Sequence, residues 1–158
     1  MAADIRRKGF RGIIRSFRPD DTEKVKGILA DSAEAADWSA ESFKESLSWA
    51  GVVALMSEGE GQATGFIFGR QIADEAEILN LAVRRERRRR GEGEALLKAA
   101  LAGFLERKVT RLFLEVRESN ETAIAFYAKH GFSKTGRRLG YYRDPAEAAV
   151  LMERKLTG

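Results

Sequence analysis

The chain has 158 residues, of which 44% are apolar and 9% aromatic, and this is enough for one domain with a buried core. It has no cysteine and one histidine, His130, which excludes disulfides, thiolate chemistry and a multi-histidine metal site and leaves a single residue for any Ser-His-Asp triad. The net charge is +4, but residues 84–90 contribute +5, so the basic charge is local and favours one anionic ligand site or a nucleic-acid patch.

Residues 1–11 are polar and basic without periodicity, and we predict that they form a flexible arm before one domain of residues 12–158. The arm lacks the apolar run of a signal peptide. No later segment is apolar for long enough to span a bilayer, so we expect a cytoplasmic protein with no membrane partner.

The first third of the domain predicts a strand and two helices. Residues 13–17 are typical of a strand, and Pro19 then stands at the first position of a helix that reaches about residue 30. A second helix is predicted over residues 38–49, because Ser39 can cap it and apolar side chains recur at helical spacing.

The middle of the chain predicts three consecutive strands. Residues 52–57 and 63–72 are strand-like and are separated by a glutamate-glycine turn, and residues 77–83 form a further apolar run. Because the connections are short, we expect an antiparallel meander.

The last third predicts a crossover to a further strand and then a C-terminal helix and hairpin. Apolar residues between 96 and 105 lie on one helix face, and residues 111–116 follow as a strand. Ser119 can cap a helix that ends near residue 129. Strands near 131–141 and 149–155 complete the chain.

Two glycines, Gly91 and Gly93, lie where a strand enters a helix, so backbone N–H groups and the helix dipole can face a phosphate. Ala95 and Leu96 exclude the dinucleotide-binding glycine pattern, and no Lys-Ser or Lys-Thr follows as in a P-loop. Two alternatives remain: the glycines are ordinary turn residues, or the arginines Arg84, Arg85 and Arg87 form a solvated block. RNA binding is also an alternative, although this segment lacks the interleaved aromatic residues that stack on bases.

The segment from Arg88 to Gly93 is similar to the Gln/Arg-x-x-Gly-x-Gly/Ala motif of the GNAT acetyltransferase superfamily. The resemblance implies an α/β GNAT fold, a single mixed, mostly antiparallel twisted sheet of about six to seven strands flanked by about four helices. It also implies acetyl-CoA as co-substrate, no metal, and a pyrophosphate on this loop. The residues assigned to the cofactor are Leu81, Ala82 and Val83 through their main chain, with Arg88, Arg89, Arg90, Gly91, Glu92, Gly93, Glu94 and Asn120.

A carboxylate at Glu115 interrupts a buried-looking strand, where a charge is costly unless it is paired or used. An ion pair with Arg117, two residues further on the same strand face, would explain it. Tyr127 lies on the following helix, where a core aromatic residue is the simplest interpretation.

Residues 114–120, 125–127 and 131–132 resemble, nearly residue for residue, the ribosomal-protein-alanine N-acetyltransferases within GNAT. The resemblance implies that Glu115 is the proton acceptor and Tyr127 the proton donor. It places Trp38, Tyr141 and Tyr142 near the acceptor. Departures at Asp37, Arg143 and Ala148 fall in this acceptor-facing part of the chain.

The proton-transfer pair fits direct transfer of acetyl to an amine. An N-terminal ammonium, with a pKa of about 8, must lose a proton before it attacks, and a departing thiolate, with a pKa of about 8.5, must gain one. We therefore predict an acetyl-CoA-dependent N-acetyltransferase whose acceptor is the N-terminal alanine of small-subunit ribosomal protein eighteen. Another protein N-terminus, a lysine or a small amine is the alternative acceptor, and a non-catalytic CoA- or RNA-binding module is the alternative class.

Overall fold

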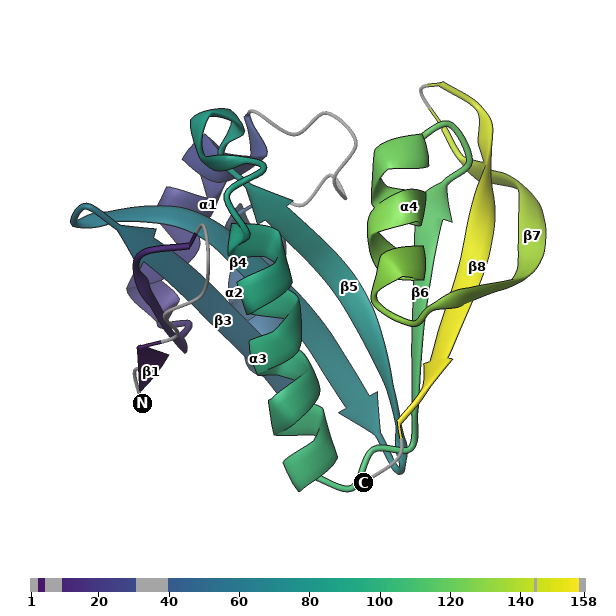
Figure 1. The fold of residues 1–158 in the computed structure, drawn as a ribbon, viewed down its shortest axis with the longest axis horizontal. Coiled ribbons are helices and arrows are strands. Elements are labelled where there is room, and N and C mark those ends of the chain that lie inside the picture. The colour runs from purple at the N-terminus through teal and green to yellow at the C-terminus, as the bar shows by residue number, and fades with distance from the viewer. Residues whose placement is uncertain (1–2, 5–9, 31–39, 144, 157–158) are drawn as a thin grey trace.

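A mixed sheet of eight strands forms the centre of the structure, a computed structural model that describes residues 3–4, 10–30, 40–143 and 145–156. Within these residues, the strands are β1 (Ala3–Asp4), β2 (Ile13–Ser16), β3 (Val52–Gly59), β4 (Gln62–Ile72), β5 (Glu75–Val83), β6 (Arg111–Arg117), β7 (Ser133–Tyr142) and β8 (Glu147–Lys155). Their order in the sheet is β1-β2-β3-β4-β5-β6-β8-β7 (Figure 1). Only β5 and β6 pair in parallel, so the predicted mixed, mostly antiparallel sheet is confirmed.

Four α-helices flank the sheet in the described part of the chain, as predicted. They are α1 (Thr22–Leu29), α2 (Ala40–Leu47), α3 (Glu92–Glu106) and α4 (Glu121–Lys129). The predicted first helix begins as a 3₁₀ turn at Pro19, whose fixed φ suits the first position of a helix. Trp38 and its predicted cap Ser39 lie outside the described residues.

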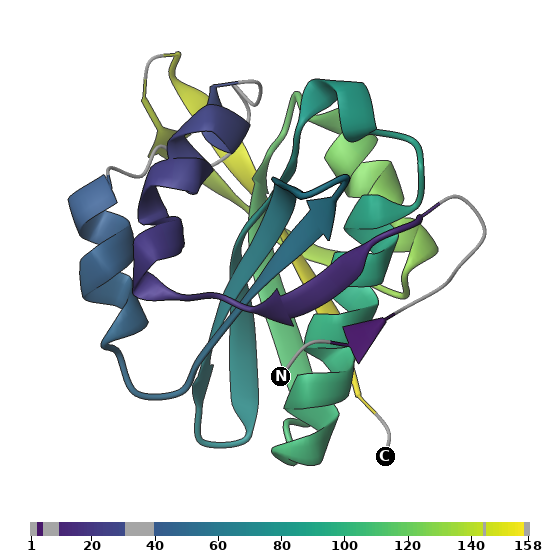
Figure 2. The ribbon, with the colours of Figure 1, turned by 90° about the vertical axis from the view of Figure 1, so that its left-hand side faces the viewer.

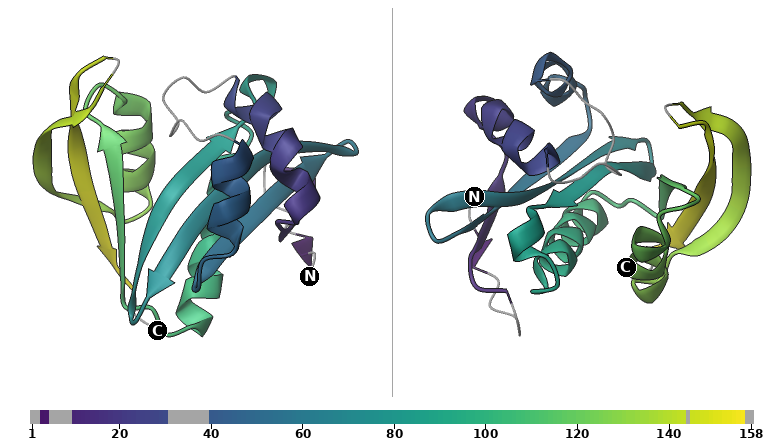
Figure 3. Two further views of the ribbon diagram at one scale, coloured as in Figure 1. Left: turned by 180° about the vertical axis from the view of Figure 1, so that it is seen from behind. Right: turned by 90° about the horizontal axis from the view of Figure 1, so that it is seen from above.

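The helices divide between the two faces of the sheet. Figure 2 and the view from above in Figure 3 show α1 and α2 on one face and α3 and α4 on the other. Each face has its own core: Phe43 of α2 packs with Phe66 and Phe68 of β4, whereas Ile67 between them packs with the α3 face. This alternation is the two-residue period of a strand that is buried on both sides.

The parallel pairing of β5 and β6 stops halfway along both strands. It runs from Glu75 opposite Arg111 to Ile78 opposite Leu114, although β5 continues to Val83 and β6 to Arg117. Figure 1 shows the two strands meeting at one end and diverging toward the other. We call this divergence, formed by residues 79–83 of β5 and 115–117 of β6, the fork.

A β-bulge at Leu79 lies at the base of the fork. Phe68 and Gly69 of β4 pair with Asn80 and Ile78, so Leu79 is an extra residue. The bulge reverses which side chains face α3: Ala76 and Ile78 do so before it, and Leu81 and Val83 after it. The end of β5 therefore presents its odd-numbered side chains to the α3 side of the sheet.

Part of the predicted N-terminal arm contacts the domain. Ala3–Asp4 pairs with β2 in antiparallel fashion, and the Phe10 side chain is buried in the core on the α3 face. Residues 1–2 and 5–9 lie outside the described residues, so the flexibility of the arm stays a prediction. Residues before the predicted boundary at Gly12 thus add to the fold.

Candidate active site

The N-terminus of α3 is built to face an anion. Gly91 is its N-cap and has a left-handed φ of 78°, a conformation that costs glycine little and other residues more. The helix continues for 15 residues and is held by buried Leu96, Leu97 and Phe104. Its first N–H groups have no partners within the helix, and the aligned peptide dipoles make this end positive.

Gly93, in the first turn of α3, is not required by packing within the protein. A Cβ atom placed there would lie 3.7 Å from the Phe126 ring and 4.0 Å from Val83, which are ordinary contacts. Packing therefore does not explain the absence of a side chain. Glycine there leaves the backbone open to the close approach of a ligand.

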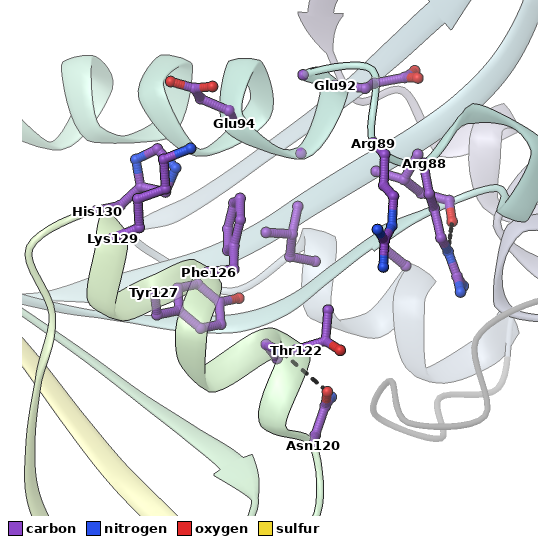
Figure 4. A pocket seen from close by; sticks show the side chains of 16 residues that line it. Arg88, Arg89, Glu92, Glu94, Asn120, Thr122, Phe126, Tyr127, Lys129 and His130 are labelled. Atoms are coloured by element: carbon purple, nitrogen blue, oxygen red, sulfur yellow. Dashed lines mark hydrogen bonds between the residues drawn. The ribbon is translucent and has the colours of Figure 1, made fainter.

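A pocket of about 650 Å³ lies between α3, α4 and the end of β5 (Figure 4). It brings together most of the residues predicted to bind the cofactor: Leu81, Ala82, Val83, Arg88, Arg89, Gly91, Glu92, Gly93, Glu94 and Asn120, together with Tyr127. Arg90, Glu115, Tyr141 and Tyr142 do not line it. Five further lining residues were not predicted from the sequence: Thr122, Ala123, Phe126, Lys129 and His130. The helical spacing of α4, counted from Tyr127, could have identified that face.

The arginine-rich loop is anchored to the fold. Arg88 donates from Nε to the Val83 carbonyl oxygen at 3.1 Å, which ties the loop to the end of β5. Arg87 pairs with the buried Glu92 carboxylate at 3.5 Å, and its side chain is only 12% exposed. The interpretation of Arg87 as a solvated charge is therefore wrong.

The Glu92 carboxylate faces the protein, because it also accepts a hydrogen bond from the Thr64 hydroxyl. A ligand in the pocket can therefore contact the main chain of Glu92, while Arg87 neutralises the charge of the Glu92 side chain.

The negative charge of Glu94 is neutralised within α3. Lys98, one turn further on, binds the Glu94 carboxylate at 2.7 Å, and this hydrogen bond lowers the pKa of Glu94. Burial lowers the pKa of His130 across the pocket, as do the neighbouring cations Lys98, Lys129 and Arg154, so the imidazole is neutral at pH 7. With Arg88, Arg89 and Lys129 in its lining, the pocket is positive.

Helix α4 begins one residue later than predicted. Asn120, and not Ser119, is the N-cap, since its side-chain oxygen accepts a hydrogen bond from the Ala123 N–H at 3.1 Å. The Ser119 N–H instead binds the Glu147 carboxylate at 2.5 Å. The cap fixes the start of the helix that carries Tyr127.

Tyr127 is buried and lines the pocket. Burial raises the pKa of its phenol, so the hydroxyl is protonated at physiological pH. Figure 4 shows this hydroxyl pointing into the pocket, and among the described residues it makes no hydrogen bond. The residue is thus a core aromatic, as one interpretation of the sequence held, and it also presents a hydroxyl to a ligand.

Glu115 lies at the fork, one residue beyond the last pair between β5 and β6. Its side chain is 20% exposed and lies 3.4 Å from Arg138 of β7. The alternative explanation of Glu115, an ion pair with Arg117, is wrong: Arg117 pairs with Glu147 at 3.3 Å on the neighbouring strand β8.

The two predicted tyrosines of the acceptor side lie beside Glu115. The Glu115 carboxylate raises the pKa of Tyr141 to about 12 through hydrogen bonding and its charge, and burial of the phenol raises it as well. Burial raises the pKa of Tyr142, and the Glu115 charge raises it further. Glu77 of β5 is a fourth member of this group: loss of solvent raises its pKa, as does the charge of Glu115, although the residue is exposed.

Glu115 and Tyr127 approach the fork from opposite faces of the sheet. On β6, Leu112, Leu114 and Val116 face α3 and α4, so Glu115 points to the α1 and α2 face. Tyr127 packs on the α3 face with the pocket. A donor bound in the pocket and an acceptor on the other face can therefore meet only where the strands separate.

No group of three or more histidine, aspartate or glutamate side chains in the described ranges could hold a metal ion. In the same part of the chain, none of the helices has the length and apolar character needed to cross a membrane.

A forked mixed sheet with a glycine-containing helix N-terminus beside the fork defines the class of acyl-CoA-dependent N-acetyltransferases. The model of the Acetyltransferase (GNAT) family matches residues 16–132, and the chain belongs to this family. It is an acetyl-CoA-dependent N-acetyltransferase.

Similar proteins include an enzyme from Escherichia coli K12 that is named [ribosomal protein bS18]-alanine N-acetyltransferase. It is 34% identical over 126 residues, which cover 78% of this chain and 84% of that protein. The crystal structure of the ribosomal-protein-S18-alanine N-acetyltransferase from Escherichia coli has a TM-score of 0.84 at 30% identity, covering 93% of this chain and 96% of that one. Ard1 from Thermoplasma volcanium also has a TM-score of 0.84, at 33% identity, covering 93% of this chain and 99% of that one.

The residues of the pocket fit acetyl-CoA, which supplies the acetyl thioester when bound. The N-terminus of α3, with Arg88 and Arg89, matches a pyrophosphate in charge and in hydrogen-bond donors. Beyond Ile78, the edge of β5 that faces the fork has no pairing with β6, so it offers main-chain groups to an amide-containing arm.

We expect Gly93→Ala to weaken acetyl-CoA binding about tenfold and leave the fold intact. The added Cβ meets only ordinary contacts inside the protein, but it occupies the surface where the ligand must approach, and overpacking costs about 1–3 kcal/mol. Gly103→Ala on the same helix is the matched control, since a Cβ there meets nothing within 4 Å. Titration calorimetry measures both affinities. Equal affinities in the two variants would contradict this role of Gly93.

Proposed function

We propose that this enzyme acetylates the N-terminal alanine of ribosomal protein bS18, with Glu115 as proton acceptor and Tyr127 as proton donor. The observation that carries the proposal is the placement of these two side chains on opposite faces of the fork. The names of the Escherichia coli relatives support the acceptor. A ribosomal-protein acceptor implies a reaction in the cytoplasm.

Glu115 is suited to receive the acceptor amine. At neutral pH an N-terminal amine is largely an ammonium ion, and it becomes nucleophilic only after it loses a proton. Glu115 offers a carboxylate at the fork, on the face opposite the pocket. It therefore attracts the ammonium ion and takes its proton, directly or through a water molecule.

Tyr127 is suited to give a proton to the leaving sulfur. Its buried phenol has a raised pKa, so it carries its proton throughout the physiological range. It lines the pocket on the α3 side of the fork, which is the proposed place of the thioester. Acetyl passes directly to the amine, and the absence of cysteine agrees with a reaction without an acyl-cysteine intermediate.

Tyr141 and Tyr142 form the acceptor side of the site. Their rings meet edge to face with centroids 5.0 Å apart, and Arg117 lies 4.4 Å over the Tyr142 ring. Tyr141 is 44% exposed and so presents its ring to solvent beside Glu115. An extended peptide can pack against this pair while its N-terminus reaches Glu115.

The acceptor is tested by CoA release from acetyl-CoA with a peptide that carries the N-terminus of bS18. We expect turnover, with mass spectrometry locating one acetyl group on the N-terminal alanine. The same peptide with a chemically blocked N-terminus is the control and should be inert. Equal turnover of a blocked peptide that contains lysine would assign a lysine acceptor instead. Acetyl-CoA binding without turnover of any amine would favour the non-catalytic module.

A further inference from the structure

Arg138 of β7 holds the carboxylate that the proposed mechanism uses. Its Nη1 atom lies 3.4 Å from Oε1 of Glu115, and its guanidinium lies 5.0 Å over the ring of Tyr141. The Glu115 carboxylate also raises the pKa of Tyr141, so these two groups interact. Arg138 and Tyr141 thus form a small cover over Glu115 on the acceptor side.

A bulge in β7 makes this cover possible. Residues three apart on a regular strand point to opposite faces, so Arg138 and Tyr141 could not both reach Glu115. The pairing with β8 jumps from Arg138 opposite Ala149 to Tyr142 opposite Glu147, and Gly140 in the bulge has a φ of 63°. The left-handed glycine breaks the alternation and re-aims the side chains beside the site.

The charges around Glu115 explain why an arginine is held there. The carboxylates of Glu115 and Glu77 lie on one sheet face near each other, and the charge of Glu115 raises the pKa of Glu77. Arg138 is the cation that offsets both. Tyr141 and Tyr142 are neutral, and Arg117 is engaged with Glu147.

We propose that Arg138 is a displaceable counter-ion that occupies, in the resting enzyme, the place of the acceptor's ammonium group on Glu115. This inference rests on the proposed role of Glu115. The side chain of Arg138 is 56% exposed, so its pair with Glu115 is weak and solvent can replace it at little cost. Arg138 competes with the acceptor for the Glu115 carboxylate and takes no part in proton transfer.

Removal of the guanidinium should therefore help the acceptor to bind. We expect Arg138→Gln to lower the KM for the acceptor by about two- to fivefold, which is the factor that an exposed ion pair contributes. We expect kcat to stay within about twofold, because the guanidinium takes no part in proton transfer. Arg138→Lys keeps the charge and should restore a KM close to that of the wild type.

Arg137→Gln is the matched control, because Arg137 is the neighbouring residue and pairs with Glu118 at 2.7 Å instead of Glu115. We would measure steady-state kinetics for the wild type, both glutamine variants and Arg138→Lys. The acceptor can be any amine that the wild type acetylates, provided that its acetylation depends on Glu115. A lower KM in Arg138→Gln alone supports the proposal. An unchanged or raised KM, or a lowered kcat, overturns it. If no amine is acetylated, or if Glu115→Gln is fully active, the proposed function itself has failed.

Discussion

Glu115→Gln should lower kcat by about a hundredfold or more, with little change in the affinity for acetyl-CoA. The amide has nearly the shape of the carboxylate and can still accept a hydrogen bond from Tyr141, but it cannot take a proton from the ammonium ion. Glu115 does not line the pocket predicted to bind acetyl-CoA, so donor binding should be unaffected. Steady-state kinetics with the bS18 peptide, together with calorimetry for acetyl-CoA, separates the two effects.

Glu118→Gln is the control for this substitution. Glu118 follows three residues later, is exposed, and pairs with Arg137 outside the fork. We expect it to behave as the wild type, since an exposed ion pair contributes little. If Glu115→Gln and Glu118→Gln had the same kcat, Glu115 would be only the ion-pair partner of Arg138.

The phosphate side of the site could be read from the sequence because its determinants are local. Gly91 and Gly93 lie within one turn of each other, and the strand before them and the helix after them have clear periodicity. The neutralisation of Glu94 was also readable, since Lys98 follows at the i+4 position of the same helix. Patterns within one element therefore predicted the helix and marked the two glycines, whereas the phosphate role of the loop came from the family resemblance.

The acceptor side could not be read in the same way because its contacts join distant strands. Glu115 is followed on its own face by Arg117, yet β8 separates β6 from β7 and brings Glu147 to Arg117. Arg138 reaches Glu115 only because the pairing of β7 skips residues near Gly140. The only sequence signal of this register shift is one glycine, and glycines also occur in ordinary turns.

At the base of the fork, too, the sequence pattern could not predict the directions of the side chains. The run of residues 77–83 predicted a strand, and the structure has one. The bulge at Leu79, however, moves Leu81 and Val83 onto the face that regular alternation would give to Ala82. Pattern alone therefore predicted the strand but not which side chains meet the pocket.

Tyr127→Phe should lower kcat by at least about tenfold while the fold and the affinity for acetyl-CoA are retained. The substitution removes only the hydroxyl. Among the described residues this hydroxyl has no hydrogen-bond partner, so its loss leaves no buried group unsatisfied. Phenylalanine keeps the edge-to-face contacts with Phe126 and Phe132, whose centroids lie 5.3 and 5.4 Å away. The core thus stays packed, and the lost proton donor is the only change at the reacting sulfur.

Comparison with Tyr127→Leu separates the role of the ring from that of the hydroxyl, because this variant removes both. It should lower the free energy of unfolding by about 1–3 kcal/mol in addition to the loss of kcat, because a buried aromatic ring is replaced by a smaller side chain. Thermal unfolding and kcat measured on both variants distinguish the two roles. A Tyr127→Phe enzyme with wild-type kcat would make Tyr127 a core aromatic alone, and the leaving thiolate would then have to take its proton from solvent in the pocket.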